Sequence, residues 1–128
     1  YYNLAHERFL KPADDVAVLE HLRDLPQGVT MSSFNYTTLT AYIALKTPLY
    51  APTKAPTLIR DSEEKKRVTL EFFETHNANC TAWKNANIAY TFLDGKNAFA
   101  PLPKEAFTLL AEQGKAKLYA FDANKCAQ

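Results

Sequence analysis

The segment Gly28–Ala51, GVTMSSFNYTTLTAYIALKTPLYA, predicts a β-α-β unit and decides the fold class of this chain. A short strand at Val29–Ser32 leads into small polar side chains, a helix is expected over Thr38–Leu45, and a second strand at about Leu49–Ala51. A helix between two strands indicates that the strands run parallel, because parallel strands need a long crossover connection.

The rest of the chain continues this alternation of helices and strands. An amphipathic helix is expected before the unit, with Val18, Leu22 and Leu25 on its buried side. After the unit we expect a helix from the capping box at Asp61–Glu64 to about His76 and a short helix capped by Asn79. A strand at Ile88–Leu93 follows. The last two expected elements are a helix that ends at Gly114, with Ala106, Phe107 and Leu110 inward, and a strand at Ala116–Phe121. The pattern predicts an α/β fold, with a layered, mainly parallel sheet of about four strands and helices on both faces.

Length and composition predict one globular domain. The chain has 128 residues, of which 47% are hydrophobic and 23% charged, which is enough for a real core. We expect a lead-in over residues 1–12, the domain over 13–122 and a tail over 123–128. Because the chain starts at Tyr1 without Met, we expect it to be a piece of a longer protein.

The charge balance argues against nucleic acid as a partner. The formal net charge is +1, whereas nucleic-acid-binding surfaces need clustered Lys and Arg side chains. The one basic run, Lys65-Lys66-Arg67, follows Glu63-Glu64 directly. We therefore expect a solvated helix face with internal ion pairs at this run.

The two cysteines, Cys80 and Cys126, leave two alternatives open. They are either unrelated thiols or a disulfide that ties the end of the chain to the middle of the domain. A disulfide that closes a loop of this length stabilises the fold by about 4 kcal/mol in the chain-entropy model. Their spacing fits no metal site.

The motifs of the common enzyme classes are absent from the sequence. The only glycines are Gly28, Gly95 and Gly114, so there is no glycine-rich phosphate loop, and no G-x-S-x-G nucleophile elbow is present. The three histidines, His6, His21 and His76, form no pair with metal-ligand spacing. We expect no catalytic residue, no metal and no cofactor in this chain.

The best candidate for a binding site is the edge of the sheet at which the parallel strands end. Open α/β sheets bind their ligands at the carboxyl ends of the strands. The candidate binding residues near these ends are Ser33, Asn35, Tyr36, Lys54, Arg60 and Asp94. The alternative is that such side chains only cap helices, as Asn35 or Thr37 is expected to do, and solvate loops.

The layout of five segments resembles a known family. These are the helix at Asp14–Arg23, the P-x-G-strand stretch Leu25–Val29, KTPLY at Lys46–Tyr50, the helix from Arg60 to the paired aromatics Phe72-Phe73, and KNANIAYTF at Lys84–Phe92. Together they resemble the soluble C-terminal domain of polytopic bacterial membrane glycosyltransferases of the GT-C type, which use lipid-linked sugar donors, and of related membrane proteins. The resemblance covers roughly residues 13–121.

The resemblance implies a setting and a function. It implies a non-catalytic domain on the extracytoplasmic face of a bacterial membrane, periplasmic or at the cell surface, where a disulfide can persist. The implied partners are the membrane-embedded part of the same chain and a glycan acceptor or lipid-linked sugar. The catalytic acid of such enzymes would lie in loops near the membrane, outside this segment. Two alternatives are a free-standing enzyme or small-molecule binder that uses the strand-end edge, and a purely structural interaction domain.

Overall fold

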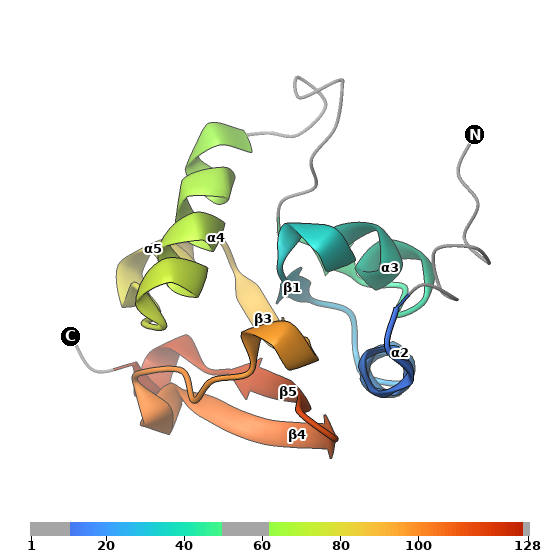
Figure 1. Ribbon diagram of the computed structural model, residues 1–128. Coiled ribbons are helices and arrows are strands. Elements are labelled where there is room, and N and C mark those ends of the chain that lie inside the picture. Colours follow the sequence, from blue (N-terminus) through green and yellow to red (C-terminus); the bar gives the residue numbers. More distant parts are fainter. Residues whose placement is uncertain (1–10, 50–61, 127–128) are drawn as a thin grey trace.

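A single mixed sheet forms the centre of the molecule (Figure 1). The computed structural model describes residues 11–49 and 62–126. In these residues the strands lie in the order β2-β1-β3-β5-β4. Their bounds are β1 Val29–Met31, β2 Thr47–Pro48, β3 Ile88–Leu93, β4 Phe107–Gln113 and β5 Ala116–Phe121. The helices are α2 Ala13–Arg23, α3 Thr37–Tyr42, α4 Ser62–Thr75 and α5 Cys80–Asn85, with short 3-10 helices η1 Phe34–Tyr36, η3 Gly95–Asn97, η4 Lys104–Ala106 and η5 Ala123–Lys125.

The predicted β-α-β unit is present. Strand β1 pairs in parallel with β2 on one side and with β3 on the other. The second strand lies at Thr47–Pro48, earlier than expected, and Leu49 extends the pairing by donating its N–H to the carbonyl of Thr30 at 2.9 Å. Pro48 fits here because β2 is an edge strand, where a missing N–H leaves no ladder bond unmade. The remainder of the expected range, Tyr50-Ala51, lies outside the described residues.

The prediction of a mainly parallel sheet of about four strands was wrong in its details. There are five described strands, and β5 pairs antiparallel with both β3 and β4. The error comes from Ala106–Gly114, where a helix was expected but β4 forms. Leu, Ala and Glu favour helix in isolation. Here the turn at Gly114, with φ +61°, closes a hairpin onto β5 and buries Phe107 opposite Phe121.

Helices cover both faces of the sheet, as predicted, and alternate strand residues face the two sides. On one face, α2 and α3 bury Leu19, Leu22 and Leu39 against Phe92 and Leu118. On the other face, α4 and α5 pack against a second group of strand residues that includes Met31, Leu93 and Phe121. Figure 1 shows the two helix pairs on opposite sides of β1 and β3.

Aromatic rings fill the face under α4 and α5. The ring centroid of Trp83, on α5, lies 4.7 Å from that of Phe72, on α4, and 4.9 Å from that of Phe121. Phe107 joins the same cluster, 5.5 Å from Trp83. We call Phe72, Trp83, Phe107 and Phe121 the aromatic layer. Edge-on and tilted ring contacts at such distances stabilise a core beyond simple burial.

A disulfide between Cys80 and Cys126 borders the aromatic layer. Their Cα atoms lie 5.8 Å apart, within the usual range for such a bond. Of the two alternatives that the sequence left open, the structure contains the disulfide. It links the first residue of α5 to the segment after η5, so the packed structure extends to Cys126.

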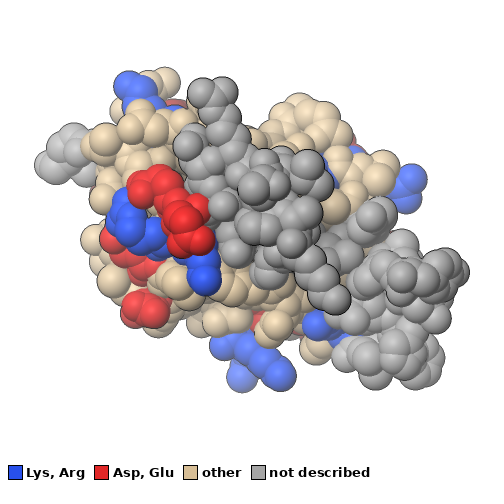
Figure 2. Space-filling view, turned by 90° about the horizontal axis from the view of Figure 1, so that it is seen from above, with Lys and Arg blue, Asp and Glu red and all other residues tan. Residues whose placement is uncertain are grey.

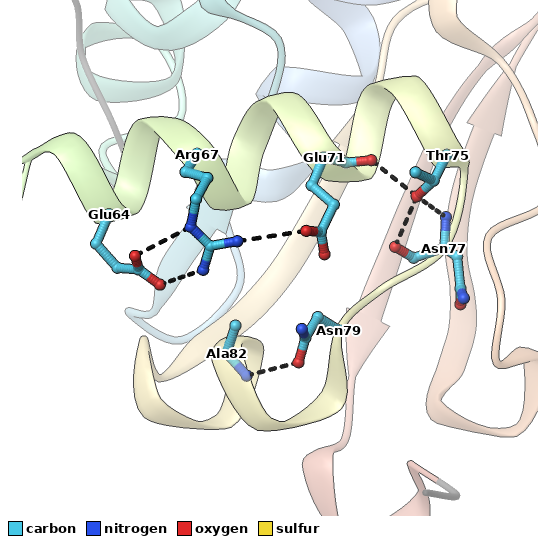
Figure 3. A network of polar contacts seen from close by, with 7 residues as sticks. All are labelled: Glu64, Arg67, Glu71, Thr75, Asn77, Asn79 and Ala82. Carbon is cyan, nitrogen blue, oxygen red and sulfur yellow. Dashed lines mark hydrogen bonds and ion pairs between the residues drawn. The ribbon is translucent and has the colours of Figure 1, made fainter.

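The outer face of α4 carries the ion pairs that the sequence predicted. Figure 3 shows Arg67 between Glu64 and Glu71, with N···O distances of 2.5 and 3.3 Å. The hydrogen bond with Arg67 lowers the pKa of the Glu64 carboxyl and raises the pKa of Arg67. Asn79 caps α5, as expected, by accepting a hydrogen bond from the Ala82 N–H at 3.1 Å. Because the α4 groups are exposed and satisfied by one another, this face is a solvated surface.

Candidate functional site: the strand ends of β1 and β3

The carboxyl ends of β1 and β3 form a topological switch point. Strand β1 lies between β2 and β3, the connection to β2 runs through α3 on one face, and the connection from β2 to β3 runs through α4 and α5 on the other. Where consecutive connections leave a sheet on opposite faces, they leave a crevice at the strand ends between them. The edge predicted from the sequence is therefore the edge at which a crevice is expected.

Asp94 is the central polar group of this edge. It follows β3 directly and is 2% exposed. Its Oδ1 accepts a hydrogen bond from the Ser33 hydroxyl at 3.3 Å, and its two carboxylate oxygens accept from the Asn97 amide nitrogen at 2.9 and 3.2 Å. The predicted proximity of Ser33 and Asp94 is thus confirmed, while their role in binding stays a prediction.

A small pocket opens beside these groups, with a volume of about 130 Å³. It is lined by Ser33, Phe34, Thr69, Leu70, Phe73 and Asn97. Ser33 and Phe34 come from the turn after β1, Asn97 from η3, and the other three from α4. The pocket therefore draws on all three segments around the switch point, and its wall is mostly apolar. Such a wall is typical of ligand sites, but the volume is below the roughly 300–1,000 Å³ of pockets for drug-sized molecules, so only a smaller ligand suits it.

A second buried carboxylate, Asp15, holds the two turns that form this edge. Asp15, on α2, is 2% exposed and accepts hydrogen bonds from the Tyr36 hydroxyl and from the Gly95 N–H, the latter at 2.9 Å. Asp15 therefore ties α2 to the turn after β1 and to the turn after β3. We call Asp15, Ser33, Tyr36, Asp94, Gly95 and Asn97 the polar junction.

Of the other predicted binding residues, neither Tyr36 nor Asn35 is among the described residues that line this pocket. Tyr36 is buried and its hydroxyl points to Asp15. Asn35 is exposed. The expectation that Asn35 or Thr37 caps the helix was wrong, because Tyr36 occupies the cap position without a side-chain hydrogen bond and Thr37 is the first residue of α3. Lys54 and Arg60 lie outside the described residues.

Three residues of the polar junction, Asp15, Gly95 and Asn97, were not among the binding residues predicted from the sequence. In the sequence, Asp15 stands beside Asp14 in the first turn of a helix, where both carboxylates suit the helix dipole. Its position four and seven residues before the buried Leu19 and Leu22 was the available signal, because it places a carboxylate on the apolar side of a helix. Asn97 follows Asp94 by three residues, a spacing that allows a side-chain contact within one turn.

The visible surface of the described residues carries both signs of charge. On the face that Figure 2 shows, acidic and basic side chains of the described residues lie close to one another, and no broad area of one sign forms. Within residues 11–49 and 62–126, no group of three or more His, Cys, Asp or Glu side chains could hold a metal ion. The described groups at this edge are the apolar wall of the pocket and the hydrogen-bonding atoms of Ser33 and Asn97.

The comparisons with known proteins gave no relative. No family model matches the chain, and neither a curated protein nor a solved structure matches it. Among the helices of the described residues, none is long and apolar enough to cross a bilayer.

Proposed function

We propose that this chain is a non-catalytic extracytoplasmic domain of a bacterial glycosyltransferase-like membrane protein, which contacts a glycan acceptor or lipid-linked sugar. The observation that carries the proposal is the disulfide between its only two cysteines. Disulfides persist in oxidising compartments and are rare in the cytosol. The resemblance to the soluble domains of GT-C-type enzymes agrees with such a compartment.

The polar junction supports a non-catalytic role. Asp15 accepts hydrogen bonds from Tyr36 and Gly95, and Asp94 accepts from Ser33 and Asn97. A general acid or base must reach the proton that it transfers in a plausible substrate position. Two buried carboxylates that are held by neighbouring donors favour a scaffolding role over proton transfer.

Thiol trapping in intact cells tests the proposal. The full-length protein, in the cells that produce it, is quenched with acid and treated with a maleimide that adds mass, with and without prior reduction. We expect Cys80 and Cys126 to react only after reduction. If both thiols react without reduction in freshly quenched cells, the proposed compartment is wrong.

The pocket at the switch point favours a second candidate, a free-standing domain that binds a small molecule. The two candidates differ in the length of the parent protein. Several hydrophobic spans ahead of Tyr1 in the full gene product would support the membrane protein. A short soluble leader would instead support the free-standing binder.

A further inference from the structure

We propose that the pocket between β1, η3 and α4 binds a single neutral sugar ring. The proposal deepens the glycan contact proposed above by assigning it to named groups, and it rests on that function only for the source of the sugar. The chemical argument has three steps: the hydrogen-bonding capacity of the polar side, the nature of the apolar wall, and the charge of the lining.

The polar side of the pocket offers acceptors. The carboxylate of Asp94 accepts the Ser33 hydroxyl proton, and its two oxygens share one N–H of the Asn97 amide. Ser33 and Asn97 both line the pocket. What they have left for a ligand is the lone pairs of the Ser33 hydroxyl, the Asn97 carbonyl oxygen and the second N–H of the Asn97 amide. A ligand that satisfies these groups must bring donors together with an acceptor, as the hydroxyl groups of a sugar do.

The opposite wall suits one face of a ring. Phe34, Leu70 and Phe73 line the pocket with aromatic and aliphatic surface. Phe73 is only half-buried although it packs on Phe72 and Phe99, with centroid distances of 5.1 and 6.2 Å. Those contacts fix the orientation of its ring. A pyranose carries C–H groups on one face and hydroxyl groups around its rim, which matches a wall and an edge of this kind.

The described lining favours a neutral ligand. None of the six described lining side chains is charged, and the carboxylate of Asp94 lies behind Ser33 and Asn97. Apart from one amide N–H, an anion would meet the lone pairs of Ser33 and Asn97 backed by this carboxylate, and like charges repel strongly in a partly buried site. The sugar ring itself, and not a phosphate attached to it, is therefore the group proposed to be recognised.

NMR titration of the isolated 128-residue chain with neutral methyl glycosides tests the proposal. The panel contains the methyl glycosides of glucose, galactose, mannose and N-acetylglucosamine, with benzyl alcohol as an apolar probe that carries one hydroxyl. We expect at least one glycoside to bind with a dissociation constant of order millimolar, as befits a ligand of this size. The amide signals of Ser33, Gly95 and Asn97 should shift, and saturation of aromatic protons should transfer to the C–H groups of the ring.

Variants locate the binding. Ser33→Ala and Asn97→Ala each remove one acceptor, so each should weaken the glycoside about tenfold or more. Phe73→Leu keeps the apolar character but removes one flat face, and it should weaken the saturation transfer, since Phe34 still lines the pocket. Asn85→Ala, at an exposed asparagine at the end of α5, is the matched control and should leave the affinity unchanged. The spectrum of each variant reports whether it remains folded.

Three results would overturn the proposal: no glycoside shifts the pocket amides, benzyl alcohol binds as tightly as the best glycoside, or the corresponding sugar 1-phosphate binds more tightly at these residues. A folded Ser33→Ala variant with unchanged affinity would also overturn it. Thiol trapping reports the compartment independently of sugar binding. Sugar binding can therefore fail while the proposed location holds, and the proposed location can be wrong while sugar binding holds.

Discussion

The aromatic layer and the polar junction stabilise the same sheet by different means. Under α4 and α5, the layer of Phe72, Trp83, Phe107 and Phe121 is apolar and is bordered by the disulfide. At the strand ends, buried carboxylates hold the turns after β1 and β3 through hydrogen bonds. Burial of carboxylates is costly unless every oxygen is satisfied. The aromatic layer thus accounts for stability, whereas the polar junction keeps specific atoms in place beside a pocket.

The largest loss of stability is expected from Trp83→Ala in the aromatic layer. Trp83 is 1% exposed and contacts the rings of Phe72, Phe107 and Phe121. Its removal leaves a large cavity and should lower the free energy of unfolding by about 3 to 5 kcal/mol. Urea denaturation with the disulfide intact measures the loss. Thr81→Ala, exposed on the same helix, should change stability by no more than about 0.5 kcal/mol, and a similar loss in both variants would contradict the assigned role of the layer.

A smaller loss is expected from Asp15→Ala in the polar junction. The change leaves the Tyr36 hydroxyl and the Gly95 N–H without their acceptor, and it should cost about 2 to 3 kcal/mol. Asp15→Asn retains an acceptor for Gly95 and should cost less. The neighbouring Asp14 is exposed, so Asp14→Ala serves as the control. Equal stability of the Asp15→Ala and Asp14→Ala variants would show that the buried carboxylate holds nothing in place.

A loss of about 1 kcal/mol is expected from Gly114→Ala, because an L residue is strained at its φ of +61°. A Cβ atom at this position would also meet the side chain of Asp14. Gly95 provides the matched control in the other turn. A Cβ there would meet only ordinary contacts, with Asp15 Oδ1 at 3.6 Å. Denaturation of both variants should therefore separate them, and an unchanged Gly114→Ala variant would contradict the hairpin geometry of β4 and β5.

The smallest effect is expected at alkaline pH. Burial raises the pKa of Tyr90 and of Tyr119, and Glu112 raises that of Tyr119 further. The folded state then holds these protons more tightly than the unfolded state. The stabilisation is complete below the unfolded value of about 10 and is lost as the pH rises through the higher folded values. Unfolding free energies measured from pH 8 to 11 should fall, and the fall should be smaller in Tyr119→Phe.

The sequence predicted those parts of the fold that depend on local patterns. The apolar strands Ile88–Leu93 and Ala116–Phe121 and the cap at Asn79 need only short-range signals, and all three are confirmed. The strand Phe107–Gln113 was missed because its state depends on pairing with β5, which the local sequence does not encode. Long-range pairing overrides the helix preference of Leu, Ala and Glu at this site.

The candidate site could be predicted only in outline. Strand order decides which carboxyl ends are neighbours, and the prediction placed Ser33 and Asp94 on one edge before that order was known. Asn97 and Phe73 could not be assigned, because the pocket depends on how α4 packs beside η3. The burial of Asp15 could not be predicted either, because its carboxylate on α2 accepts hydrogen bonds from two other segments, through Tyr36 and Gly95.

The distinction between the two regions is tested most directly by measuring both affinity and stability for Ser33→Ala. The hydroxyl of Ser33 lies 3.3 Å from Asp94, and Asn97 still satisfies that carboxylate when Ser33 is lost. We predict that the affinity for the best methyl glycoside falls about tenfold while the free energy of unfolding falls by about 1 kcal/mol or less. Unchanged affinity in the folded variant would contradict the assignment of Ser33 to the sugar-binding pocket.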